Sequence, residues 1–132
     1  MELVPLEKLK EAANNDSEFR IAARFWTTVL HVGVGDLSYL VRIKDGVIDG
    51  VARCEPSPQL WDQWTAWKIS ISAPLEDWRN FCEPVPRPFY QDLFGAVAHH
   101  GFRVEGEKEG FFQYFPAIRR MLDIVRGLSR QG

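Results

Sequence analysis

The sequence predicts an α+β fold, an α/β sandwich in which a five-stranded, mainly antiparallel sheet packs against helices. Three observations predict it: a helical period at both ends of the chain, a strand-like alternation between them, and two turn dipeptides. Apolar residues recur every three to four positions in the first quarter of the chain and again from residue 108, whereas they alternate with polar residues over 27–54 and 67–73. The dipeptides Gly35-Asp36 and Asp45-Gly46 separate three strand-like runs as hairpin turns.

Two short helices are expected first. Leu6 and Leu9 share one side of a helix that fades at Asn14. Asn15 is then the expected N-cap of a second helix reaching Trp26, because Glu18 three residues later completes a capping box.

The three runs that follow predict an antiparallel meander over 27–34, 37–44 and 47–53. Asp45-Gly46 suits a two-residue type I′ turn, in which both residues need positive φ. In the second run alternate residues define an apolar face of the strand. The intervening Ser38, Arg42 and Lys44 define the opposite, solvent-exposed face, and only Leu40 breaks this pattern. The apolar positions are Leu37, Tyr39, Val41 and Ile43.

Prolines divide the second half of the chain. Pro56 and Pro58 open a linker, after which a fourth strand is expected over 67–73 and a short helix from Pro74 to about residue 81. A further helix over 89–98 and a fifth strand over 102–106 follow. From residue 108 a long amphipathic helix extends to 125, and Pro116 inside it predicts either a kink or a helix that begins near it.

Length and charge restrict the function. The 132 residues fit one domain spanning 1–132, and 45% hydrophobic residues suffice for a core. A net charge of −2 argues against nucleic acid as a partner. Cys54 and Cys82 lie in no disulfide or zinc pattern, and no signal peptide or membrane span is recognisable. We therefore expect a cytoplasmic protein.

No motif indicates catalysis, a cofactor or a metal, so a non-enzymatic role is expected. The adjacent His99 and His100 point about 100° apart on a helix, which disfavours a shared metal ion. His31 has no obvious carboxylate partner, and Asp36 and Asp45 are explained by turn chemistry.

Aromatic content is the unusual quantity, with Phe 9, Trp 5 and Tyr 3 making 13% of the chain. Any single ring is explained by ordinary core packing. If the helices over 89–98 and 108–125 both pack on the apolar sheet face, however, the rings exceed what one small core needs, and an apolar ligand pocket is predicted. The candidate lining residues are Tyr39, Val41, Trp67, Ile69, Phe89, Leu93, Phe94, Phe102, Phe111, Phe115 and Ile118.

Three stretches resemble the sterol carrier protein type 2-like family: LSYLVRIKDGVIDG, WKISISAPLEDWRNF and PFYQDLFGAVAHHGFRVEGEKEGFFQYFPAIRRML. The resemblance covers about the last three-quarters of the chain and rests on element order and periodicity. It implies a sheet covered on one face by helices, with an apolar tunnel for sterols, fatty acyl chains or similar molecules. It carries no catalytic residue over.

Other functions stay open. A small isomerase or epoxide hydrolase with an aromatic pocket is one, although such chains close with strands and this one closes with a helix. An interaction module or homodimer is another, since Trp61 and Trp64 lie in the proline-flanked linker. A basic flank on the last helix is typical of a solvated face, with a ligand carboxylate or transient membrane contact as the alternative. It comprises Arg119, Arg120, Arg126 and Arg130.

Overall fold

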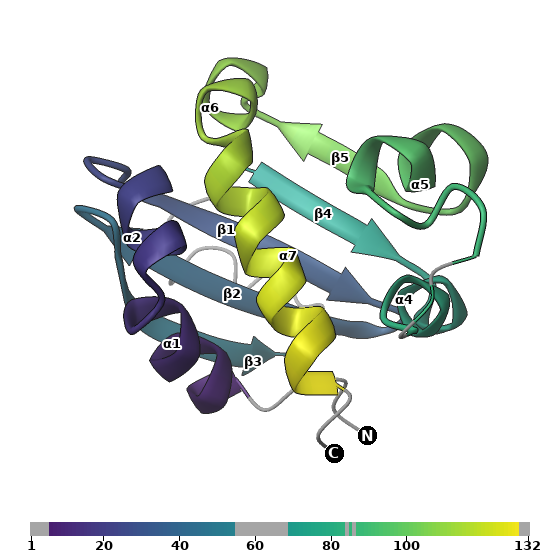
Figure 1. Ribbon diagram of the computed structural model, residues 1–132, viewed down its shortest axis with the longest axis horizontal. Helices are drawn as coiled ribbons and strands as arrows, with labels where there is room; N and C mark the ends of the chain where they lie inside the picture. The colour runs from purple at the N-terminus through teal and green to yellow at the C-terminus, as the bar shows by residue number, and fades with distance from the viewer. Residues whose placement is uncertain (1–5, 55–68, 84, 86, 130–132) are drawn as a thin grey trace.

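The computed structural model describes residues 6–54, 69–83, 85 and 87–129. Its five strands form one sheet in the order β3-β2-β1-β4-β5 (Figure 1). The strands are β1 (Thr28–Val34), β2 (Leu37–Lys44), β3 (Val47–Cys54), β4 (Ile69–Ala73) and β5 (Arg103–Gly106). The helices are α1 (Leu6–Asn14), α2 (Ser17–Ala22), α4 (Leu75–Phe81), α5 (Leu93–His99), α6 (Lys108–Gln113) and α7 (Phe115–Ser129).

The meander is confirmed, and so is the mainly antiparallel sheet. β1 pairs antiparallel with β2 and β2 with β3, whereas β1 pairs in parallel with β4. Asp45 and Gly46 both have positive φ, 50° and 81°, as a type I′ turn requires. β5 closes one edge, antiparallel to β4.

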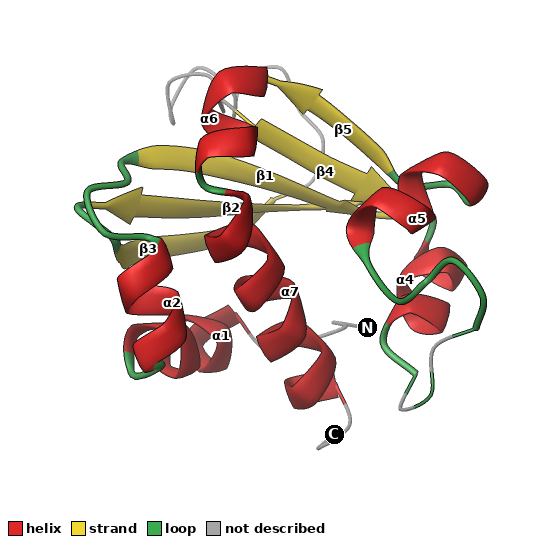
Figure 2. Ribbon diagram, turned by 45° about the horizontal axis from the view of Figure 1, so that its top comes forward, coloured by secondary structure: helices red, strands yellow, loops and turns green. Residues whose placement is uncertain are grey.

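The helices lie on one side of this sheet (Figure 2). α1, α2 and α7 cross its face, and α4 and α5 lie near the C-terminal ends of β1 and β4 (Figure 1). Tyr39, Val41 and Ile43 of β2 are buried in the core that this layer encloses. The opposite face of β2 was expected to be exposed to solvent, but it is exposed only in part. Ser38 and Leu40 are buried there, whereas Arg42 and Lys44 are exposed. In the described part of the chain no helix is long and apolar enough to cross a membrane.

Helix starts depart from the predictions where another capping residue competes. Asp16, not Asn15, caps α2: its carboxylate accepts a hydrogen bond from the Phe19 amide at 2.8 Å. That helix ends at Ala22, well short of Trp26.

The helix expected over 89–98 begins later than predicted. Asp92 caps α5 by accepting a hydrogen bond from the Gly95 amide at 2.8 Å, so the helix starts at Leu93. Phe89 lies outside it, with a positive φ of 70°. The final segment is two helices, and α7 begins one residue before Pro116. The second of the two alternatives for this proline is therefore correct.

Candidate functional site

An apolar cavity of about 40 Å³, partly open to solvent, lies between the sheet and the helices α1 and α7. Tyr39 and Val41, both predicted to contact a ligand, line it from β2. The remaining lining comes from β1, α1, α4 and α7, namely Val32, Val34, Leu6, Leu9, Trp78, Met121, Leu122 and Val125. The indole Nε1 of Trp78 donates a hydrogen bond to the Gly33 carbonyl at 2.9 Å.

Two arginines attach α7 on either side of its cavity-lining residues. Arg120 donates from Nε and Nη2 to the Asp16 carboxylate, at 2.9 and 2.8 Å. Arg126 donates from Nε to the Phe81 carbonyl at 2.8 Å and from Nη2 to the Tyr90 carbonyl at 3.0 Å. These two residues are therefore not part of a solvated basic flank, which corrects the sequence-based interpretation.

The Asp16–Arg120 pair changes the acidity of both groups. The hydrogen bond from Arg120 lowers the pKa of the Asp16 carboxyl, with burial opposing and the Phe19 amide assisting. The same hydrogen bond raises the pKa of Arg120 above its ordinary value. Both groups stay charged at neutral pH, so the attachment of α7 to α2 persists there.

A second hollow, an open groove of about 280 Å³, lies between α5, β5 and α6. Leu93 and Phe94 of α5 face Phe111 and Phe112 of α6 across it, and Val104 lines it from β5. The Phe94 ring lies 6.1 Å from that of Phe111, centroid to centroid. Phe94 and Phe112 are 46% and 61% exposed, so this groove presents aromatic surface to solvent.

A third hollow, a crevice of about 190 Å³, lies between α7 and residues 91–93 and adjoins the other two. Leu122 lines both the crevice and the interior cavity, and Leu93 lines both the crevice and the groove. The crevice therefore shares one leucine side chain with each of the other two hollows. The crevice is the polar member of the three, because Asp92, Arg119 and Asp123 lie at it.

The predicted lining residues fall into groups. Tyr39 and Val41 line the cavity, while Leu93, Phe94 and Phe111 line the groove and Phe115 lines the crevice. Ile69, Phe102 and Ile118 are buried in the core and line none of the described hollows. Phe89 is 49% exposed, stacked on His99 with centroids 3.7 Å apart. Trp67, like Trp61 and Trp64, lies outside the described residues.

A polar group on the other sheet face was not recognised from the sequence. His31 of β1 places Nδ1 2.7 Å from Ser70 Oγ and Nε2 3.0 Å from Ser38 Oγ. Burial lowers the pKa of His31, with the charge of Glu105 opposing. Ser70 is 39 residues away, so only the parallel pairing of β1 with β4 brings it to His31. Within the described ranges, no three His, Cys, Asp or Glu side chains could hold a metal ion.

Comparison with solved structures defines the class of fold. The chain has the fold of sterol carrier protein 2, a five-stranded mixed sheet with helices packed on it. No protein-family model and no curated protein matches the sequence.

Three solved structures carry this assignment. A crystal structure of sterol carrier protein 2 is 15% identical, covers 92% of this chain and 93% of its own, and superposes with a TM-score of 0.73. A conserved hypothetical protein from Thermus thermophilus, described as possibly a sterol carrier protein, is 18% identical (97% and 90% covered, TM-score 0.69). The ubiquinone synthesis protein UbiJ-SCP2 is 14% identical (92% and 87% covered, TM-score 0.55).

Proposed function

We propose that this chain, as one domain, binds a lipid or another apolar small molecule between its sheet and α7, for storage, transfer or presentation rather than catalysis. The observation that carries the proposal is the lining of the cavity, which consists of apolar and aromatic side chains from both layers. Pockets of this composition bind ligands mainly by removing apolar surface from water. The names of the structural neighbours support the same class of ligand.

The cavity must expand to hold such a ligand. At about 40 Å³ it is smaller than the roughly 150 Å³ void that admits benzene in a protein interior. Because Arg120 and Arg126 attach α7 to its neighbours, outward movement of the whole helix is disfavoured. Leu122 lines both the cavity and the crevice, and Leu93 lines both the crevice and the groove, so rotation of these two side chains is the route by which we propose that the hollows join. A continuous tunnel stays a prediction.

The test uses two leucine-to-alanine variants. Leu122→Ala removes a side chain that lines both the cavity and the crevice, whereas Leu30→Ala removes a buried side chain of β1 that lines none of the described hollows. Each costs about 2–4 kcal/mol of stability. We expect Leu122→Ala to bind a fluorescent fatty acid or sterol several-fold more tightly than the natural chain, and Leu30→Ala not to.

Native mass spectrometry supplies the independent readout. Protein purified without detergent should carry a co-purified lipid mass. A bare polypeptide mass, together with no binding of fluorescent fatty acid or sterol by any variant, would contradict the proposal. Cytoplasmic location and homodimer formation stay predictions, to be measured by fractionation and light scattering.

A further inference from the structure

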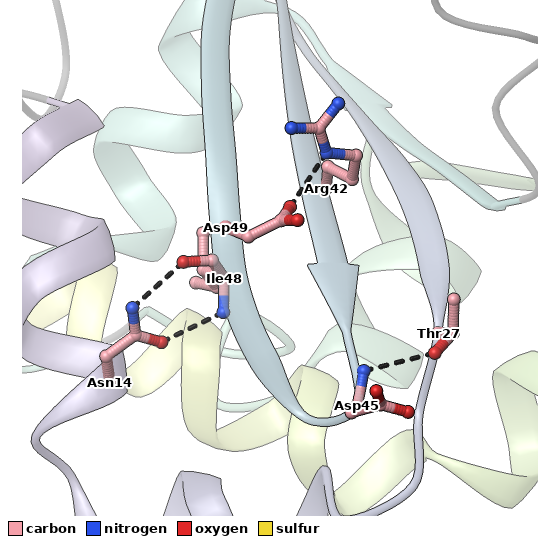
Figure 3. A network of polar contacts seen from close by, with 6 residues as sticks. All are labelled: Asn14, Thr27, Arg42, Asp45, Ile48 and Asp49. Atoms are coloured by element: carbon pink, nitrogen blue, oxygen red, sulfur yellow. Dashed lines mark hydrogen bonds and ion pairs between the residues drawn. The ribbon is translucent and has the colours of Figure 1, made fainter.

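Two loops at one end of the sheet form a single hydrogen-bonded unit. The connection from α2 to β1 and the turn between β2 and β3 lie side by side (Figure 1). The Gly46 amide donates to the Trp26 carbonyl at 2.9 Å, and the Asp45 amide to Thr27 Oγ1 at 3.1 Å. The side chain of Asn14 donates from Nδ2 to the Ile48 carbonyl and accepts at Oδ1 from the Ile48 amide, each at 2.9 Å (Figure 3). Side chains on these loops are thus held in a fixed arrangement.

Three apolar side chains of this unit face solvent. Ile21 is 78% exposed, Phe25 75% and Val47 41%. Phe25 also has a φ of 71°, a left-handed conformation that is uncommon and costly for a bulky residue. An exposed phenylalanine held in a strained backbone contributes little to the core, so the strain points to a role at the surface.

Cations surround these side chains. Arg20 and Arg24 line the same shallow hollow as Ile21 and Val47, and the Arg24 guanidinium lies 5.0 Å from the Phe25 ring centroid. Lys44 is the cross-strand partner of Val47. We call these residues the basic apolar tip; they are Arg20, Ile21, Arg24, Phe25, Lys44 and Val47.

The cations of the tip outnumber the unpaired carboxylates near it. Asp49 is paired with Arg42 at 2.7 Å, whereas Glu18 lies 3.5 Å from Arg120, whose charge Asp16 already balances. Among the described residues, Glu18 and Asp45 are thus opposed by Arg20 and Arg24 at the hollow and by Lys44 beside it. The tip is therefore positive on a chain whose net charge is −2.

We infer that the basic apolar tip inserts into the interface of an anionic lipid bilayer. Apolar side chains ringed by arginine and lysine match the acyl boundary and the charged headgroups of such a surface at once. A second copy of the chain meeting this tip symmetrically would set arginine against arginine, which disfavours self-association there. The inference does not depend on the interior cavity holding a ligand.

Vesicle sedimentation tests it, with phosphatidylcholine vesicles compared with vesicles containing about one-third phosphatidylserine. The natural chain should bind only the anionic vesicles, and more weakly as salt rises. An Ile21→Ser/Phe25→Ser variant should bind roughly ten-fold or more weakly, since two inserted apolar side chains are lost. Arg20→Gln/Arg24→Gln should weaken binding by roughly five-fold for each removed cation.

The matched control is Val97→Ser/Phe112→Ser, which removes two exposed apolar side chains of the aromatic groove, where Glu105 and Glu107 lie. It should bind vesicles as the natural chain does. Equal binding to both vesicle types, or equal loss in tip and control variants, would overturn the inference. So would displacement from vesicles by DNA, or a concentration-dependent dimer abolished by the tip substitutions. Fluorescent fatty acid binding by the tip variant reports separately on the cavity.

Discussion

Arg120 of α7 forms a bidentate pair of hydrogen bonds with the carboxylate of Asp16, which is the N-cap of α2 and lies 104 residues away in the sequence. One carboxylate thus both caps a helix and attaches the last helix to the first two. Bidentate arginine–carboxylate pairs of this geometry are stronger than ordinary surface ion pairs. Their side chains are 33% and 18% exposed, so solvent screens the pair only in part.

Substitutions at Asp16 should separate its two roles. Asp16→Asn keeps a capping oxygen but loses the charge, and we expect it to lower the free energy of unfolding by about 1–2 kcal/mol. Asp16→Ala should cost about 1 kcal/mol more, because the cap is lost as well. Urea unfolding measures both. Glu18→Gln, at a carboxylate that is 74% exposed, should change stability by less than about 0.5 kcal/mol. Equal losses for Asn and Ala would contradict the capping role.

Removing the other attachment of α7 should also destabilise the chain. Arg126→Met keeps the packing of the side-chain stem but leaves the Phe81 and Tyr90 carbonyls without their donor. We expect a loss of about 2–3 kcal/mol. Arg119→Met is the control, since Arg119 is on the same helix and its side chain is exposed to solvent. Losses of similar size in the free energy of unfolding of both variants would show that the positive charge, and not the hydrogen bonds of Arg126, stabilises the fold.

Stability should fall in mild acid because of His31. Burial lowers the folded-state pKa of its imidazole, so the unfolded chain binds the proton more tightly. The stabilisation is complete above the unfolded pKa of about 6.5 and is lost as pH falls below it. In His31→Gln, the urea concentration at the midpoint of unfolding should depend less on pH between about pH 7 and 5 than in the natural chain. Asp16, whose pKa is also lowered, acts only in a lower window, below about pH 4. Identical slopes in both proteins would contradict this assignment.

Relieving the strain at Phe25 should stabilise the fold. Asparagine tolerates positive φ better than phenylalanine, and the phenyl ring that would be lost is mostly exposed. We expect Phe25→Asn to raise the free energy of unfolding by about 0.5 kcal/mol while weakening vesicle binding. Thermal unfolding and sedimentation of the same preparation measure the two effects. Lower stability for this variant would show that the ring contributes to packing.

The elements were predictable where the signal is local. Asp45-Gly46 defined the hairpin, and the alternation of Tyr39, Val41 and Ile43 identified the core face of β2. Helix starts were less predictable, because Asn15 and Asp16 compete as adjacent caps, and the neighbouring backbone decides between them.

The site was predictable only in part, because its contacts join distant segments. The apolar character of Phe94, Phe111 and Phe115 was visible, but not that they lie at a groove and a crevice beside the interior cavity. The ligand role of Ile69, Phe102 and Ile118 stays a prediction. The arginine flank was misinterpreted because Arg120 and Arg126 find partners 104 and 45 residues away, and periodicity carries no information on such pairs.

The parallel pairing of β1 with β4 has a consequence for synthesis on the ribosome. The meander of β1, β2 and β3 consists of neighbours in sequence and can form as soon as it emerges. The second edge of β1, from Leu30 to Val34, is completed only when Ile69–Ala73 follows. A nascent chain stalled between these points presents an unpaired central strand, the hydrogen-bonding template that chaperones must shield from aggregation.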